Sequence, residues 1–227
     1  MATWKYGLQT LTRQHRQEAL EFLMNNFRKD EPLSRAASIT CSEIETCFNS
    51  VLDRCLLHPL SVVARCKETN KLVGCMLNSV WRKEDALKEA QKKAAEEDFK
   101  FSSERLPVRT LGEILNELHD SFWSLKPEHD VVLHFEIASV NQNFRRQGMA
   151  SQFLKWTEDI DRLKSVNASG ILAEATSLAN QTLLSRKGYE TLATTMLNMK
   201  CDTNGEQILK CDDGTDRVLL MFKEFKY

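Results

Sequence analysis

The stretch Ser139–Trp156, SVNQNFRRQGMASQFLKW, says most about the fold because two different patterns meet in it. The apolar run VVLHFEIASV at 131–140 ends inside this stretch and has the length of a buried strand. From about Gly148 to Val166, apolar residues recur with the spacing of an amphipathic helix. A turn with two arginines, a glutamine and a glycine therefore connects a buried strand to the start of a helix.

This turn has the features of an anion-binding site. The first N–H groups of a helix have no partners within it, and the helix dipole makes that end electropositive. Gly148 lets a ligand approach the backbone, Ala150 is small, and Arg145 and Arg146 add positive charge. The spacing is too short for a P-loop and lacks the three glycines of a dinucleotide fingerprint. The alternative interpretation is a basic surface turn that starts a helix.

The rest of the chain predicts a mixed α/β order in a single domain over residues 1–227, with a helical insert at about 82–123. Further strands are expected at 4–11, in a hairpin around residues 67–71, and at 170–176, 189–200 and 217–225. Further helices are expected at 15–27, 42–57, 82–105, 110–123 and 178–188. A capping box from Ser42 to Glu45 is expected to begin the second of these helices.

Composition and charge narrow the classes of function. Hydrophobic residues make up 42% and charged residues 28% of the 227 residues, which is an ordinary globular balance. The formal net charge of −1 argues against a broad surface for nucleic acid. No apolar run reaches the length of a membrane span, and the N-terminal residues lack the core of a signal peptide. A cytoplasmic protein is therefore expected.

The seven cysteines are an odd number and include no CxxC pair. Cys41, Cys47, Cys55, Cys66 and Cys75 lie in periodic apolar segments, so we expect buried free thiols in a reducing compartment. A zinc site or a disulfide framework is the alternative. None of the cysteines lies in a motif that suggests an acyl-enzyme nucleophile.

The R-x-x-G-x-A pattern of Arg145, Gly148 and Ala150 resembles the pyrophosphate loop of the GNAT superfamily of acetyltransferases, and the order of elements is also similar over most of the chain. This resemblance implies a mixed central sheet of about seven strands, flanked by helices and splayed at the site of its cosubstrate, acetyl-CoA. No metal is expected. The resemblance places acetyl-CoA against the backbone of Ala138, Ser139 and Val140, the turn formed by Arg145, Arg146, Gln147, Gly148, Met149 and Ala150, and Asn180 in the next helix.

The segment DEPL at 30–33 resembles the same segment of the insect arylalkylamine (dopamine) N-acetyltransferases. In that subfamily the glutamate is the catalytic base and acts through ordered water, and here it is Glu31. The resemblance implies an arylalkylamine acceptor, with Phe27, Leu33, Phe48 and Leu178 as candidate walls of its pocket. The alternative for DEPL is a solvated turn that ends a helix.

Other candidates for proton transfer lie later in the chain. His134 and Glu136 alternate along one strand and face the same side, where they could relay a proton. They match the positions of two histidines in the vertebrate arylalkylamine acetyltransferases, and a satisfied buried pair is the competing interpretation. Ser177 matches a serine of the insect enzymes, but Ala179 and Asn180 replace their Tyr-Ser pair. Leu184 stands where many GNAT enzymes have a tyrosine as general acid.

These features predict an enzyme that moves an acetyl group from acetyl-CoA to a primary amine by direct attack in a ternary complex. The expected partners are acetyl-CoA and a small amine, with no nucleic acid or membrane, in a monomer or weak dimer. A polyamine or a protein lysine is the alternative acceptor. A further alternative is a catalytically silent CoA-binding module whose helical insert binds a partner.

Overall fold

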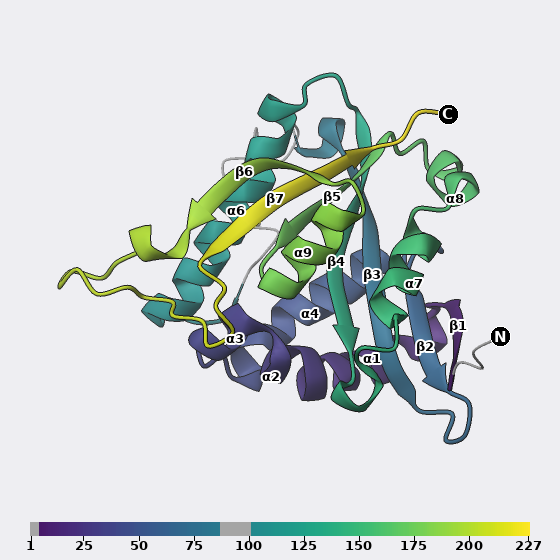
Figure 1. The fold of residues 1–227 in the computed structure, drawn as a ribbon, viewed down its shortest axis with the longest axis horizontal. Helices are drawn as coiled ribbons and strands as arrows, with labels where there is room; N and C mark the ends of the chain where they lie inside the picture. The colour runs from purple at the N-terminus through teal and green to yellow at the C-terminus, as the bar shows by residue number, and fades with distance from the viewer. Residues whose placement is uncertain (1–4, 87–100) are drawn as a thin grey trace.

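The computed structural model describes residues 5–86 and 101–227, and its seven strands form one mixed sheet in the order β1-β2-β3-β4-β5-β7-β6 (Figure 1). The β4–β5 pair is parallel, and the other neighbouring strands are antiparallel. This arrangement confirms the predicted fold class. The strands are β1 (Tyr6–Thr10), β2 (Val62–Cys66), β3 (Leu72–Arg82), β4 (Val131–Val140), β5 (Gly170–Ala175), β6 (Glu190–Met196) and β7 (Arg217–Glu224).

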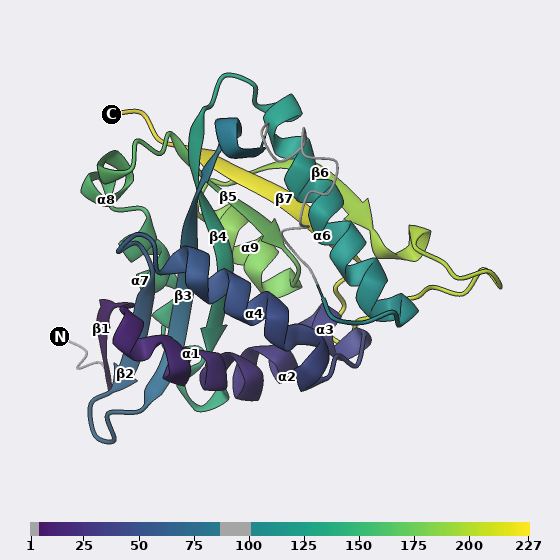
Figure 2. The same cartoon turned by 180° about the vertical axis from the view of Figure 1, so that it is seen from behind.

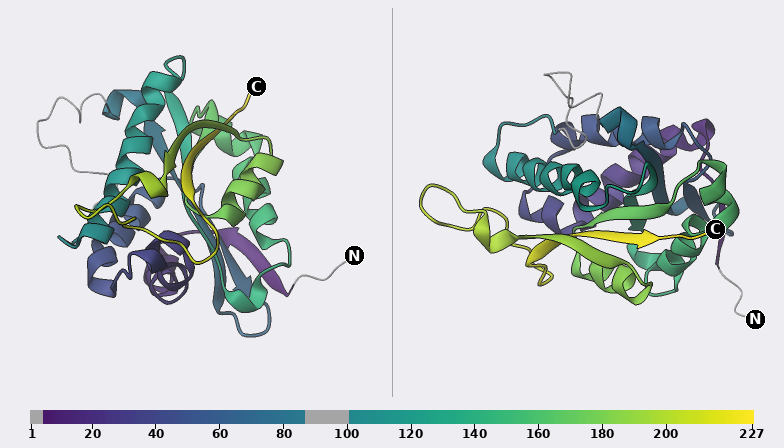
Figure 3. Two further views of the ribbon diagram at one scale, coloured as in Figure 1. Left: turned by 60° about the vertical axis from the view of Figure 1, so that its left-hand side comes forward. Right: turned by 90° about the horizontal axis from the view of Figure 1, so that it is seen from above.

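Helices cover both faces of the sheet, and each layer encloses its own apolar core (Figures 2 and 3). One face carries α1 (Arg16–Phe22), α2 (Arg28–Asp30), α3 (Pro32–Ala36), α4 (Cys41–Cys55) and α6 (Leu106–Leu125). The other carries α7 (Met149–Thr157), α8 (Ile160–Ser165) and α9 (Leu178–Arg186). Short turns of 3-10 or π type lie at Arg13–His15, Leu23–Phe27, Gln142–Phe144 and Leu197–Met199. In the described part of the chain, no helix combines the length and apolar character needed to cross a bilayer.

Several predicted element boundaries differ from those in the structure. The capping box of α4 is formed by Thr40 and Glu43, because Thr40 precedes the first helical residue. The helix predicted from Gly148 to Val166 is two helices, and the side chain of Asp159 caps the second by accepting the N–H of Arg162. At the predicted insert, β3 extends to residue 82, residues 83–86 are helical as predicted, and residues 101–105 are not. Residues 87–100 of this predicted helix lie outside the described residues.

The cysteines are free thiols, and four of the five predicted to be buried are buried. Cys47, Cys55, Cys66 and Cys75 pack in the two cores. Cys41 is exposed, because it is the first residue of α4 and precedes the part of the helix that packs on the sheet.

Candidate active site

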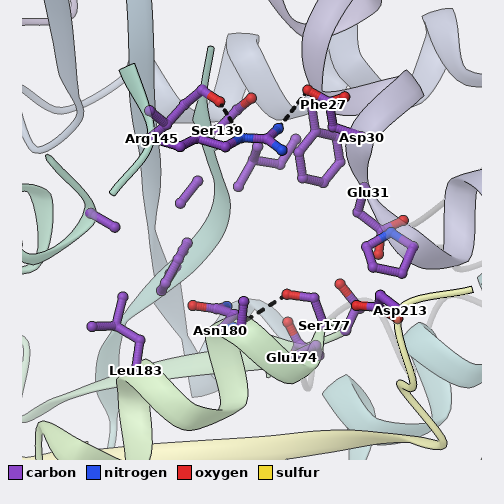
Figure 4. A pocket seen from close by; sticks show the side chains of 18 of the residues that line it. Phe27, Asp30, Glu31, Ser139, Arg145, Glu174, Ser177, Asn180, Leu183 and Asp213 are labelled. Carbon is purple, nitrogen blue, oxygen red and sulfur yellow. Dashed lines mark hydrogen bonds and ion pairs between the residues drawn. The ribbon is translucent and has the colours of Figure 1, made fainter. Parts of the chain in front are cut away.

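A cleft opens in the middle of the sheet, where β4 and β5 separate (Figure 4). The two strands pair only from Leu133–Phe135 to Ile171–Ala173, and beyond this point the edge of β4 that faces β5 has no strand beside it. The splay predicted at this position is confirmed. The cavity measures 440 Å³, and its lining includes Asp30, Glu31, Ala138, Ser139, Val140, Arg145, Ala150, Glu174, Ser177, Asn180 and Asp213.

A β-bulge shapes the floor of the cleft. Leu77 pairs with Ile137 and the next residue, Asn78, pairs with Phe135, so Glu136 is the extra residue of β4. A bulge of this kind redirects a side chain out of the regular alternation of the strand. Ile137 consequently faces the same side as Glu136, toward α4 and α6, and both residues line the cleft.

The turn that follows β4 forms one end of the cleft. Arg146 and Gly148 have φ values of 58° and 79°, and Gly148 is the N-cap residue of α7. Within residues 5–86 and 101–227, no backbone acceptor bonds to the N–H groups of residues 146–151. Ala150 lines the cleft, whereas Met149 is buried against the sheet. The turn thus presents free N–H groups and the positive end of a nine-residue helix beside the cleft.

Arg145 connects this turn to the opposite wall. Its Nε donates to the carbonyl of Val140 at 3.0 Å, and its guanidinium donates to Oδ2 of Asp30 at 2.6 Å (Figure 4). Arg145 therefore crosses the cleft between β4 and the end of α2. A phosphate that binds Arg145 must compete with the Asp30 carboxylate.

Glu31 lies in the wall of the cleft as the N-cap residue of α3. Because Pro32 follows, Glu31 takes an extended conformation, with φ −74° and ψ 127°, and the helix restarts at the proline. Its carboxylate accepts the N–H groups of Leu33 at 3.1 Å and Ser34 at 2.6 Å. Burial raises the pKa of Glu31 above its ordinary value, although these N–H groups act in the opposite direction. A carboxylate with a raised pKa is a better proton acceptor than a solvated one.

A second, mainly apolar cavity adjoins the cleft on the side of α4 and α6. A π-helical turn at Leu23–Phe27 precedes α2, and Phe27 packs edge-on against Phe48 at 6.0 Å between ring centroids. The predicted wall residues Phe27 and Phe48 line this cavity, whereas Leu33 is core and Leu178 is exposed. The other apolar side chains are Ile44, Cys47, Val51, Phe101, Leu111, Leu115 and Ile137. Both cavities are lined by Phe27, Glu31, Glu136, Ile137, Glu174 and Thr176, and these six residues form the junction of the site.

Glu136 and His134 belong to a buried network of ion pairs. Both oxygens of Glu136 accept from the guanidinium of Arg54, at 2.5 and 2.6 Å, and Ser79 also donates to Oε1. Nδ1 of His134 lies 3.3 Å from Glu136, and its Nε2 lies 2.5 Å from Glu174. Since a carboxylate only accepts, both ring nitrogens of His134 carry protons.

The pKa shifts follow from these contacts. Burial opposes ionisation of Glu136, but Arg54 and His134 outweigh it and hold its pKa well below the ordinary value. Burial alone lowers the pKa of His134, yet Glu174 and Glu136 raise it to about 10. At neutral pH, Glu136 is therefore a paired anion and His134 a cation. This arrangement favours the satisfied buried pair over the proton relay.

His119, His134 and Glu174 are the residues of this network that could hold a metal ion, since one ligand atom from each lies within 4.8 Å of the others. An ion about 2.0–2.2 Å from each of two ligands, at tetrahedral angles, needs them about 3.3 Å apart. Nε2 of His134 and Oε2 of Glu174 are 2.5 Å apart. The two atoms are in hydrogen-bonding contact at this distance, and they would have to move apart to bind one ion together.

Removing Arg54 is expected to destabilise the fold strongly. Arg54→Met leaves Glu136, whose side chain is 1% exposed, without its main counter-charge. Breaking a buried ion pair in this way costs about 3–5 kcal/mol. Urea unfolding should show this loss, whereas Arg16→Met, which breaks the exposed pair with Asp53, should cost less than about 1 kcal/mol. Equal losses in the two variants would show that the Arg54–Glu136 pair is not buried as described.

The remaining predicted residues have mainly structural contacts. The hydroxyl of Ser177 caps α9 by accepting the N–H of Asn180 at 3.2 Å, and both residues line the cleft. Leu184 is fully buried. In the described part of the chain, no tyrosine lines the cleft. The structure therefore offers no tyrosine that could protonate the leaving thiolate.

Three residues of the buried ion-pair network were not predicted from the sequence: Arg54, His119 and Glu174. They come from α4, α6 and β5, and only the fold brings them together. Glu174 had a detectable signal, because it is the one charged residue in the otherwise apolar strand GILAEA. A charge in a buried strand requires a partner or a function.

No protein-family model matches the chain, and no curated protein matches it in sequence. Several solved structures match it over nearly their whole length. Arylalkylamine N-acetyltransferase 2 from Aedes aegypti has a TM-score of 0.78 and 19% identity, covering 98% of this chain and 100% of its own. The chain has the fold of the GNAT acetyltransferases. The Drosophila melanogaster polyamine N-acetyltransferase, which forms N-acetylagmatine, has a TM-score of 0.72 and 14% identity, covering 97% and 100%. The C-terminal condensation domain of Ebony, in complex with β-alanyl-dopamine, has a TM-score of 0.70 and 18% identity, covering 98% and 100%.

Proposed function

We propose that the protein is an N-acetyltransferase that moves the acetyl group of acetyl-CoA to a primary amine. The observation that carries this proposal is the continuous cleft from the free N–H groups of the turn, along the unpaired edge of β4, to Glu31. The cleft fits the three parts of the donor in order. The pyrophosphate meets the turn and α7, the amides of the pantetheine meet Ala138–Val140, and the thioester reaches the junction.

The chemistry requires an amine with a free lone pair. Glu31 takes a proton from the ammonium group, directly or through water. The amine nitrogen then attacks the thioester carbon and the C–N bond forms. The nitrogen loses its second proton to water, and the C–S bond breaks as the CoA thiolate leaves. Because none of the tyrosines lines the described part of the cleft, water is the proton donor for the thiolate. Glu31 is favoured over Glu136 because a cation already pairs with Glu136.

The second cavity supports an arylalkylamine as acceptor. An aromatic ring gains free energy when it is buried against apolar and aromatic side chains, and a polycation cannot make this gain. The cavity begins at Glu31 and extends between Phe27 and Phe48 on one side and Leu111 and Leu115 on the other. An amine held at Glu31 would therefore have its ring in this cavity. The similar structure from Aedes aegypti is that of an arylalkylamine N-acetyltransferase, which agrees with this acceptor.

One observation favours a polyamine as second candidate. Five carboxylates line the larger cleft, namely those of Asp30, Glu31, Glu136, Glu174 and Asp213. Three of them already have cationic partners, Arg145, Arg54 and His134. This pairing reduces the number of carboxylates that a second or third ammonium group could use. The polyamine N-acetyltransferase among the similar structures supports this second candidate.

The acceptor is tested by measuring kcat/KM for tyramine, dopamine, agmatine and spermidine with acetyl-CoA, following CoA release with a thiol-reactive dye. We expect tyramine and dopamine to exceed spermidine by at least about tenfold, since burial of a ring contributes about 1.4 kcal/mol or more. A preference for spermidine or agmatine would replace the aromatic acceptor with a polyamine. No turnover of any amine would contradict the enzymatic function.

A further inference from the structure

We propose that Glu174 binds the ammonium group of the acceptor and holds it beside Glu31. This inference rests on the proposed function and assigns a residue that neither the sequence motifs nor the resemblance identified. Glu174 lies on β5 just beyond the last pair of the β4–β5 ladder, so its side chain reaches the opening between the strands. It belongs to the junction of the two cavities, as Glu31 does.

Glu174 and Glu31 approach the junction from opposite walls. Glu31 comes from the start of α3, and Glu174 comes from β5 (Figure 4). Thr176 follows Glu174 by two residues, lines both cavities with Glu174 and Glu31, and its side chain helps to lower the pKa of Glu31. An ammonium group between the two walls can therefore contact both carboxylates.

The charges at the junction leave room for one cation. Its carboxylates are Glu31, Glu136 and Glu174, and the cations bonded to them are Arg54 and His134. With the imidazole of His119, which also contacts Glu174, in its neutral form, three negative charges and two positive charges sum to −1. One ammonium group makes the buried junction neutral, and this balance stays unchanged when the proton moves from the ammonium to Glu31. Buried charges are stable only when they are compensated in this way.

Hydrogen bonding selects Glu174 rather than Glu136 for this role. Oε1 of Glu136 already accepts from Arg54 and Ser79, and Oε2 accepts from Arg54. Each oxygen of Glu174 accepts from a single imidazole, Oε1 from His119 at 3.2 Å and Oε2 from His134 at 2.5 Å. A carboxylate oxygen has two lone-pair sites. Glu174 thus keeps acceptor capacity while the two histidines fix its orientation.

The environments of the two carboxylates also separate their roles. Burial opposes ionisation of Glu174, but the histidines outweigh it and lower its pKa to about 2. Glu174 consequently stays ionised throughout the working pH range and cannot hold the amine proton. Glu31 has a raised pKa and can accept it. When the environments of two nearby carboxylates shift their pKa values apart, one commonly stays ionised while the other transfers the proton.

The test compares an amine with its neutral analogue. Tyramine and tyrosol, in which a hydroxyl replaces the ammonium, are titrated calorimetrically into CoA-saturated protein, where no acetyl transfer can occur. Glu174→Gln should weaken tyramine binding by about 10- to 100-fold, the size of a lost hydrogen bond to a charged group, and leave tyrosol binding unchanged. Glu174→Asp keeps the charge and should retain part of the tyramine affinity. The matched control Glu117→Gln removes an exposed carboxylate of α6 and should change neither.

The outcomes separate this inference from the proposed function. If the wild type binds neither tyramine nor tyrosol, the arylalkylamine acceptor itself is wrong. If the wild type binds tyramine and Glu174→Gln binds it equally well, Glu174 does not bind the ammonium group. An equal loss for tyramine and tyrosol would show that Glu174 only shapes the pocket. In steady-state assays, Glu174→Gln should raise KM for tyramine and keep the acidic limb of the pH profile that belongs to Glu31.

Discussion

Glu31→Gln is expected to lower kcat by about 10²-fold or more while acetyl-CoA binding stays intact, which is the usual size for loss of a general base. Glutamine is the informative substitution, because its carbonyl oxygen can still accept an N–H group at the start of α3. Glu31→Ala removes this cap as well and is expected to destabilise the protein by about 1 kcal/mol. Comparing the two variants separates loss of the base from loss of the helix cap.

The pH profile gives an independent measure of the same group. A general base must be ionised, so the rate falls as pH falls through its pKa. Since burial raises the pKa of Glu31, the wild type should lose activity at a higher pH than an ordinary carboxylate requires. Glu31→Gln should lack this acidic limb. Near-wild-type kcat in the variant at neutral pH would exclude Glu31 as the base.

Gly148→Glu is expected to weaken acetyl-CoA binding by about 100-fold, because it places a negative charge where the pyrophosphate meets the turn, and like charges in contact cost several kcal/mol. Gly148 has φ 79°, so any side chain also strains the backbone there. Calorimetry with acetyl-CoA measures the affinity directly.

Gly188→Glu is the matched control for that strain. Gly188 has φ 84°, and a Cβ atom added to it meets nothing within 4 Å. It lies beyond the C-terminal end of α9, away from the turn. Gly188→Glu should therefore show a comparable loss of stability and an unchanged affinity for acetyl-CoA. Wild-type affinity in Gly148→Glu would contradict the assignment of the turn as the pyrophosphate site.

The elements that hold the donor could be predicted from the sequence because each is a local pattern. The apolar run at 131–140 corresponds to β4, and the glycine at 148 marks the start of α7. The break between α7 and α8 was not predictable from periodicity, since no glycine or proline interrupts the pattern between residues 149 and 166. The break is instead marked by Asp159, whose side chain caps the start of α8.

The acceptor side of the site depends on contacts that no local pattern contains. Arg54 and Glu136 are separated by 82 residues in sequence, and His119 and Glu174 by 55. His134 and Glu136 were predicted to face the same side, and their 3.3 Å contact agrees with this. Their partners, which turn a possible proton relay into a fixed ion network, lie on α4 and β5 and depend on how these elements pack.

The most direct test of the central claim is mass spectrometry of the products that the wild type, Glu31→Gln and Gly148→Glu form from acetyl-CoA and tyramine. The account predicts that the wild type forms N-acetyltyramine and CoA in equal amounts. Glu31→Gln should form little of either even when saturated with acetyl-CoA, and Gly148→Glu should recover when acetyl-CoA is raised. Release of CoA without N-acetyltyramine, or undiminished product in both variants, would contradict acetyl transfer at this cleft.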